Sequence, residues 1–188
     1  MPPSPLLLAL RETTGPSHTA LEQRLPFFAD TFDLAAYRRL IEAYYGFHAP
    51  LEALLAGHQE PERNKVPALT RDLLALSLSP AQIDHLPLCH ALPPVDDTAS
   101  ALGVMYVLEG STLGGQVLRR AMAERLGIDA ESGGAYLDVY GSATGRNWRT
   151  FLERLAQAPA EFEAKTVNSA VATFERFAEW LDQRGAIQ

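Results

Sequence analysis

The segment from Thr98 to Leu126 constrains the fold more than any other part of the sequence. It is rich in apolar residues, Asp97 before it can cap a helix, and Gly127 after it can terminate one. This pattern predicts a long buried helix. A buried helix must be covered by other elements, so the segment sets the architecture around it.

Three glycines, Gly110, Gly114 and Gly115, fall inside this predicted helix. Each interior glycine costs about 1 kcal/mol relative to alanine, so together they cost roughly 3 kcal/mol, a large part of a small domain's stability. Gly110 and Gly114 are four residues apart and share one face, where another group can touch the backbone. The pattern is compatible with close helix packing and with a flat ligand lying on a bent helix. Ser111 adds a small hydroxyl beside that face.

The rest of the chain is helical in pattern as well. Asp33 is expected to cap a helix whose apolar stripe reaches Leu51, with Pro50 kinking or dividing it. Ser79 and Pro80 predict the start of a short helix. Two more helices are expected from near Gly145 through Leu155, and from about Pro159 to Gln183. Alternating strand patterns are scarce, so the prediction is an all-α fold with a single domain over residues 1–188.

Composition and missing motifs exclude several classes of function. The net charge of -7 argues against nonspecific nucleic-acid binding. No apolar run approaches the ~20 residues of a membrane span, and the N-terminus does not resemble a signal peptide, so no membrane partner and a cytoplasmic location are expected. Phosphate-binding Gly-Lys-Ser/Thr, Gly-x-Gly-x-x-Gly, Gly-x-Ser-x-Gly and Glu-x-x-His motifs do not occur.

The cysteine Cys89 lies near two histidines, His85 and His90, in a proline-flanked segment. These residue types can bind a metal, but their spacing matches no standard zinc pattern. We therefore expect an ordinary surface loop there. A single cysteine also excludes an internal disulfide.

A second candidate feature is His18 in the segment LRETTGPSHTALEQ, where Thr14 or Ser17 could cap a helix. Glu22 follows His18 by four residues and shares its helical face, so its carboxylate can orient the imidazole and leave the other ring nitrogen free to bind a metal. Arg11 lies two turns earlier and could pair with a ligand carboxylate. The alternative is a half-buried histidine in an ordinary helical ion pair, with Arg11 exposed to solvent.

Together, LRETTGPSHTALEQ and YVLEGSTLGGQVL resemble the proximal and distal helices of the heme oxygenase family, and the resemblance covers most of the chain. The sequence of the second segment resembles bacterial members of the family, including those that accompany bacterial phytochromes, more closely than the mammalian type. The resemblance implies a multi-helix bundle with heme sandwiched between a proximal and a kinked distal helix. Heme would be substrate and cofactor, with dioxygen and external electrons also required.

The same resemblance assigns roles to individual residues. His18 would be the axial ligand of the heme iron, and Glu22 the carboxylate behind it. Arg11 and Tyr106 would lie near the heme propionates. The distal catalytic segment would comprise Gly110, Ser111, Gly114 and Gly115.

Two positions depart from or loosely match the family pattern. Ser111 stands where mammalian-type members have a catalytic aspartate, so protons would have to pass through water held by backbone groups and Ser111. Arg146 and Arg149 lie in SATGRNWRTFLERL, which loosely resembles a later helix that contacts propionates, and they are candidate heme-binding residues.

The resemblance implies oxidative cleavage of heme to biliverdin, carbon monoxide and ferrous iron. The implied partners are a ferredoxin or flavoprotein reductase as electron donor and a bacteriophytochrome that receives biliverdin. The missing aspartate keeps open a non-catalytic heme-binding or transport protein on the same fold. A helical domain without heme and a thiamin-degrading enzyme are further alternatives, the last requiring a nucleophilic cysteine.

Overall fold

The computed structural model describes residues 3–187, and helices account for its architecture. The α-helices are α1 (Pro5–Arg24), α2 (Leu34–Leu54), α3 (Val66–Ala75), α4 (Pro80–Asp84), α5 (Thr98–Leu126), α6 (Thr144–Ala156) and α7 (Glu163–Gln183). Short 3-10 turns η1 (Pro26–Phe28), η2 (Pro61–Arg63), η3 (Tyr136–Asp138), η4 (Gly141–Ala143) and η5 (Ala160–Phe162) connect them. Within residues 3–187 no strand forms, and no helix is long and apolar enough to cross a membrane. The all-α prediction is confirmed.

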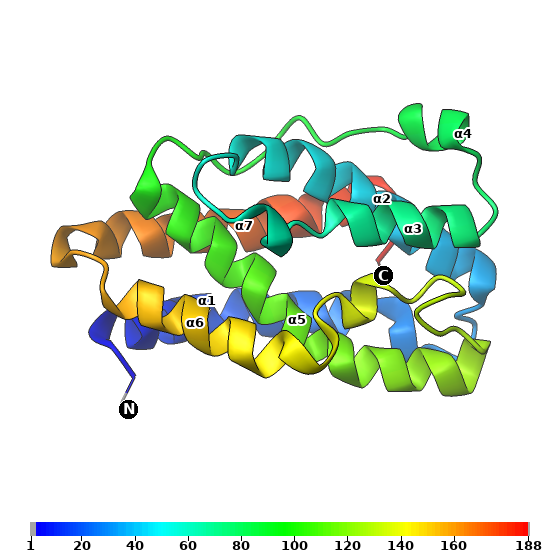
Figure 1. Ribbon diagram of the computed structural model, residues 1–188, viewed down its shortest axis with the longest axis horizontal. Coiled ribbons are helices and arrows are strands. Elements are labelled where there is room, and N and C mark those ends of the chain that lie inside the picture. The colour runs from blue at the N-terminus through cyan, green and yellow to red at the C-terminus, as the bar shows by residue number, and fades with distance from the viewer. Residues whose placement is uncertain (1–2, 188) are drawn as a thin grey trace.

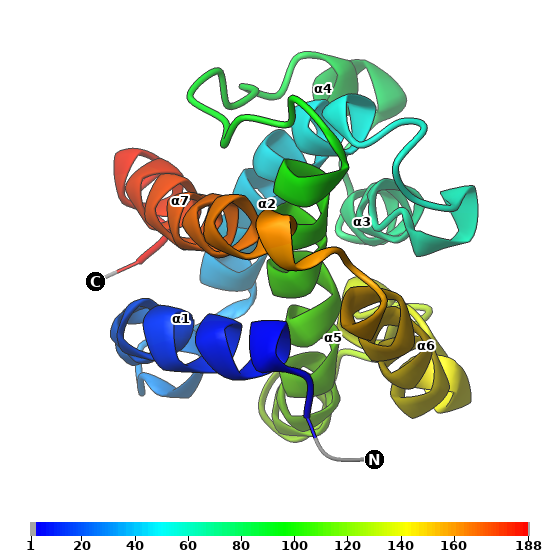
Figure 2. The same cartoon turned by 90° about the vertical axis from the view of Figure 1, so that its left-hand side faces the viewer.

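Helix α5 passes through the centre of the bundle, with α1 and α7 on one side and α3 and α6 on the other (Figure 2). Its predicted bounds are confirmed. Asp97 accepts a hydrogen bond from the Ser100 backbone N–H, and Gly127 ends the helix in the left-handed conformation. The helix changes direction partway along (Figure 1). Ser111 and Thr112 lie in its middle and donate side-chain hydrogen bonds to the carbonyls three residues earlier, an arrangement that bends helices.

Helix α7 crosses the first half of α5 at very short range. A Cβ atom on Gly103 would lie 2.2 Å from the Thr166 carbonyl oxygen, so only glycine allows this crossing. The hydroxyls of Thr166 and Ser169 donate to carbonyl oxygens in the first turn of α5, each at 2.9 Å. These bonds satisfy carbonyls at the crossing and fix α7 against α5.

Helix α1 starts earlier than predicted. Its N-cap is Ser4, and the helix continues through Thr14, Gly15 and Pro16 without interruption, so the prediction of a cap at Thr14 or Ser17 is wrong. The buried Thr14 hydroxyl donates to the Leu10 carbonyl of the preceding turn at 2.7 Å. The apolar residues Leu6, Leu7 and Leu10 bury this first half of the helix and outweigh the poor local propensity.

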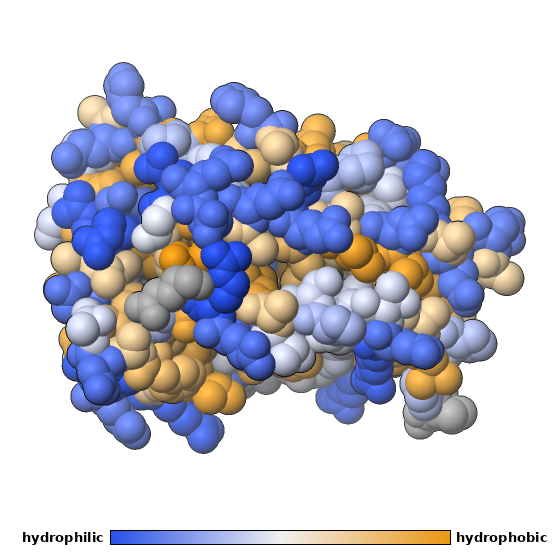
Figure 3. Space-filling model, turned by 180° about the vertical axis from the view of Figure 1, so that it is seen from behind, coloured by the Kyte–Doolittle hydropathy of each residue, from blue (hydrophilic) through white to orange (hydrophobic). Residues whose placement is uncertain are grey.

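The other helix predictions agree with the structure in most respects. Asp33 caps α2 as expected, and Pro50 lies inside that helix without dividing it. Ser79 caps α4 in a capping box with Gln82. The last helix begins at Glu163, after the turn η5. Hydrophilic residues cover much of the outer surface, with hydrophobic patches between them on the side opposite Figure 1 (Figure 3).

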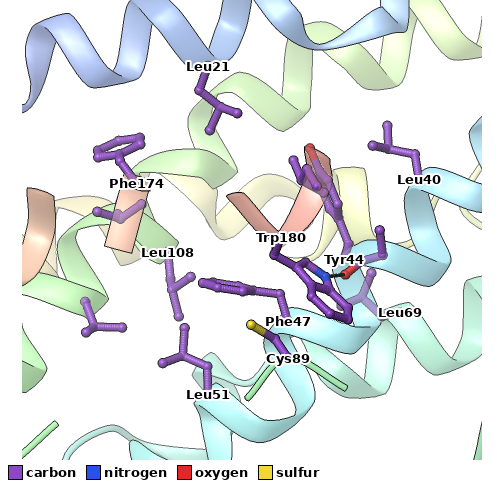
Figure 4. Close-up of a cluster of buried hydrophobic side chains, with 14 of the residues drawn as sticks. Leu21, Leu40, Tyr44, Phe47, Leu51, Leu69, Cys89, Leu108, Phe174 and Trp180 are labelled. Carbon is purple, nitrogen blue, oxygen red and sulfur yellow. Dashed lines mark hydrogen bonds between the residues drawn. The ribbon is translucent and has the colours of Figure 1, made fainter. Parts of the chain in front are cut away.

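The segment around Cys89 is a largely exposed loop, as expected, but the Cys89 side chain itself is buried. The backbone N–H of Cys89 donates to the Gly46 carbonyl at 2.8 Å, so the proline-rich segment is anchored on α2. The cysteine lies among core side chains near Phe47 and Trp180 (Figure 4), and burial raises the pKa of its thiol. No group of three or more potential metal-binding side chains occurs in the described part of the chain.

Candidate functional site

A cavity of about 500 Å³ lies between α1, α2, α5, α7 and η3. Its walls are mainly apolar. Leu21 and Phe174 line it from α1 and α7, and Phe47 and Leu108 line it from α2 and α5 (Figure 4). A volume of this size and an apolar lining with few polar groups are typical of sites for small organic ligands or cofactors.

Helix α1 brings the first predicted set of residues to this cavity. Arg11, His18 and Glu22 all line it, as their shared helical face predicts. The Nε2 atom of His18 lies 3.4 Å from Glu22 Oε1, and the His18 side chain is 53% exposed. The ring packs edge-on against Phe174 at 5.7 Å between centroids. Glu22 can orient the imidazole through one nitrogen, which leaves the second available as a metal ligand.

Arg11 supplies positive charge at the same cavity. Among the described lining residues it alone carries a permanent positive charge, and its side chain is exposed. An exposed guanidinium at the edge of an apolar cavity can pair with a carboxylate of a ligand whose body is buried. This arrangement suits an amphipathic ligand with an apolar body and an acidic edge.

The glycines of α5 divide into two kinds. A Cβ atom on Gly114 would meet no atom within 4 Å, and one on Gly110 would meet only the Trp148 ring at 3.8 Å. Both residues line the cavity. A Cβ atom on Gly115 would instead lie 2.7 Å from the Leu137 carbonyl oxygen. Close packing therefore explains Gly115, as it explains Gly103, whereas Gly110 and Gly114 leave helix backbone facing open space.

The remaining predicted residues differ in position. Ser111 and Tyr106 line the cavity, and the Tyr106 ring lies 6.0 Å from that of Trp148. Arg146 and Arg149 on α6 are exposed and lie outside the described cavity lining. The Arg149 side chain donates to the Gly145 carbonyl of its own helix. The structure thus does not bring these two arginines to the ligand cavity.

The cavity also contains polar residues that the sequence did not single out as site residues, among them His48 and Tyr136. His48 belongs to the apolar stripe of α2 and is buried. A histidine at a position of that stripe is unusual enough to mark it as a candidate site residue from the sequence. Tyr136 lies in a turn without periodicity. Asp72 of α3 positions it, because its carboxylate accepts the backbone N–H groups of Ala135 and Tyr136 at 2.7 and 2.8 Å.

A buried ionic cluster supports α5 beneath the cavity. The Glu109 carboxylate contacts the ammonium of Lys65, which is 1% exposed, and accepts from Arg63 at 2.5 Å and from the Tyr140 hydroxyl at 2.7 Å. Burial lowers the pKa of Lys65, and Glu109 opposes that effect. Because each charge is paired, the cluster ties the segment after α2 to the centre of α5.

Comparison with known proteins agrees with this geometry. The family model described as heme oxygenase matches residues 4–183. A heme oxygenase of Xanthomonas campestris is 30% identical over 158 residues, which cover 79% of this chain and 87% of that protein. Among solved structures, the heme oxygenase of Leptospira interrogans is similar with a TM-score of 0.72 and 20% identity, covering 95% of this chain and 98% of that one.

Two cyanobacterial structures share the fold as well. Heme oxygenase-1 of Synechocystis in complex with heme has a TM-score of 0.76 and 18% identity, covering 95% of this chain and 91% of that one. Heme oxygenase-2 of the same organism, in complex with heme and NO, has the same TM-score and identity over 95% of this chain and 84% of that one. With a family model that spans nearly all of the sequence, and a cavity between the two helices that carry the family's segments, the chain belongs to the heme oxygenase family.

Proposed function

We propose that this protein cleaves heme oxidatively to biliverdin, carbon monoxide and ferrous iron. The observation that carries the proposal is the pair Gly110 and Gly114, which leave bare helix backbone facing an apolar cavity also lined by His18. These glycines are costly in a helix, and protein packing does not require them: an added Cβ atom would meet nothing within 4 Å at Gly114 and only the Trp148 ring at Gly110, so a ligand that needs the space explains them.

The residues of the cavity fit heme. The His18 imidazole is a suitable iron ligand, the apolar walls suit the porphyrin, and Arg11 suits a propionate. When bound, heme supplies both the iron that activates dioxygen and the ring carbon that is oxidised. Glu22 keeps the imidazole oriented, and the apolar walls, including Phe174, exclude bulk water from the ring. We propose that the open backbone at Gly110 and Gly114 allows close approach of the distal ring face, with Tyr106 nearer the propionates.

Reduction of dioxygen requires an external electron source. We propose a ferredoxin or a flavoprotein reductase as the donor, as the family resemblance implies, and a bacteriophytochrome as one recipient of the biliverdin. A cytoplasmic location and a single domain over residues 1–188 remain predictions from the sequence. Arg146 and Arg149 remain candidates for contacts at the outer edge of the site, although they lie outside the cavity lining.

Reconstitution tests the proposal. The purified protein is loaded with heme and supplied with dioxygen and a reductant, and the absorption spectrum is followed. We expect the Soret band to disappear as biliverdin absorption rises. A Soret band that persists under these conditions would contradict catalysis and favour the alternative of a non-catalytic heme-binding protein.

A further inference from the structure

His48 is a buried histidine that the proposed roles above do not use. It lies on α2, is 2% exposed, and reaches the cavity. Its Nε2 atom lies 3.2 Å from the hydroxyl oxygen of Tyr136. On its other side, Nδ1 lies 3.7 Å from Oε1 of Glu52 and has no hydrogen-bond partner among the described residues.

A purely structural histidine would satisfy both ring nitrogens, because an unpaired buried polar atom costs about 1–3 kcal/mol. The unpaired atom here faces a carboxylate that is itself firmly held. Glu52 accepts the backbone N–H groups of Lys65 at 2.5 Å and Val66 at 3.2 Å. These two bonds hold the Glu52 carboxylate in place beside His48, with one of its oxygens facing Nδ1.

Tyr136 connects this histidine to the cavity. Its side chain lines the cavity together with Ser111, the residue at the position of the missing aspartate. Burial raises the pKa of Tyr136 well above its ordinary value, so the phenol stays protonated and can give up its proton only if another proton reaches its oxygen. The aromatic rings of Tyr44 and His48 pack edge-on against Tyr136 at 5.4 and 5.5 Å and hold its ring in place.

We propose that His48 and Tyr136 form a proton-donor pair for the reaction, with Tyr136 as the group that donates into the cavity that Ser111 also lines, and with His48, backed by Glu52, as the source of the proton that replaces it. This inference rests on the proposed heme oxygenase activity, because reduction of dioxygen consumes protons as well as electrons. It replaces the expectation that only water, backbone groups and Ser111 carry protons here.

The proton moves through two coupled bonds. The imidazolium form of His48 carries protons on both nitrogens, and Nδ1–H faces Glu52. As the Tyr136 hydroxyl proton leaves for an oxygen acceptor in the cavity, the Nε2 proton passes to the Tyr136 oxygen. Tyr136 ends as a neutral phenol and His48 as a neutral imidazole protonated on Nδ1, and solvent water returns the missing proton.

The first test uses the protein without heme. Nitrogen-15 NMR of the histidine side chains reports which ring nitrogens are protonated and hydrogen-bonded. We expect Tyr136→Phe to shift the Nε2 resonance of His48 and to leave that of His18 unchanged. An unchanged His48 resonance would overturn the proposal, because the pair would then not exist.

The second test separates proton delivery from heme positioning. Hydrogen peroxide is dioxygen that has already received two electrons and two protons, so it bypasses a proton donor. With dioxygen and reductant, we expect Tyr136→Phe and His48→Gln to slow biliverdin formation by at least about tenfold, since general acid catalysis is typically worth roughly 10²–10⁴-fold. With hydrogen peroxide, their rates of heme oxidation should stay within about twofold of the unsubstituted protein.

Matched controls make the outcomes decisive. Tyr45→Phe removes a hydroxyl from the same helix outside the described cavity lining and should leave both rates unchanged. His48→Gln keeps an amide able to hydrogen-bond Tyr136 but cannot hold a transferable proton, so full activity in this variant would make His48 merely structural. Equal losses with both oxidants would also overturn the proposal. If the unsubstituted protein forms no biliverdin with either oxidant, the proposed function itself is wrong.

Discussion

Replacing Gly114 by alanine should stabilise the heme-free protein and weaken heme binding at the same time. Gly114 lies inside α5 with helical backbone geometry, and an added Cβ atom would meet no neighbouring atom within 4 Å. An interior helical glycine costs about 0.5–1 kcal/mol relative to alanine when nothing obstructs the methyl group. For a chain of this size, that gain raises Tm by roughly 1–4 °C.

The same methyl group should hinder heme binding sterically. The space at Gly114 belongs to the cavity, and a methyl forced into a packed interface typically costs about 1–3 kcal/mol. This cost corresponds to roughly a fivefold to 150-fold loss of affinity. Thermal unfolding without heme and titration with heme, followed at the Soret band, measure the two effects on the same sample.

Gly115→Ala is the matched control one residue along the helix. Its Cβ atom would lie 2.7 Å from the Leu137 carbonyl oxygen, so this variant should lower the Tm of the heme-free protein. The reasoning would be refuted if Gly114→Ala lowered that Tm, or if it raised Tm without weakening heme binding. Either result would mean that the open glycine face does not serve the ligand.

Three further predictions concern ligation and the support of α5. His18→Ala should abolish the spectrum of histidine-ligated heme, added imidazole should restore it, and a spectrum like that of the unsubstituted protein without imidazole would exclude His18 as the ligand. Glu109→Ala leaves Lys65 buried without its carboxylate and should cost about 3–5 kcal/mol in urea unfolding; a loss below about 1 kcal/mol would argue against a desolvated pair. The hydrogen bond from Lys165, together with that from the Ser100 backbone, lowers the pKa of Asp97 from 3.8 to about 2. The ionised form thus favours folding above pH 4, and the Tm advantage over Asp97→Asn should vanish as the pH falls from 5 to 2; a constant difference would contradict the assignment.

Local patterns were sufficient to predict most of the helices. The caps at Asp33, Ser79 and Asp97 and the terminator at Gly127 act through neighbouring residues, so the sequence displays them directly. The start of α1 was not predictable in this way. Burial of its leucines sustains the helix through Gly15 and Pro16, and burial depends on the packing of distant elements.

The site residues, like the helices, were predictable where local spacing determines their positions. Helical spacing was enough to place Arg11, His18 and Glu22 on one face, and all three line the cavity. The sequence could not assign the glycines individually, because their roles depend on what lies opposite them: Leu137 faces Gly115, and open cavity faces Gly114.

The pairing of His48 with Tyr136 was also beyond local reasoning. The two residues are 88 positions apart, and their contact depends on Asp72 holding the turn that carries Tyr136. A residue that depends on a third element for its position leaves no periodic signal in the sequence.

Product stoichiometry tests the central claim most directly. The heme-loaded protein is supplied with dioxygen and a reductant, and the carbon monoxide released is quantified together with biliverdin and ferrous iron from the same sample. The account predicts equal amounts of the three products for each heme consumed. Heme that remains intact, or that is bleached without release of carbon monoxide, would contradict it.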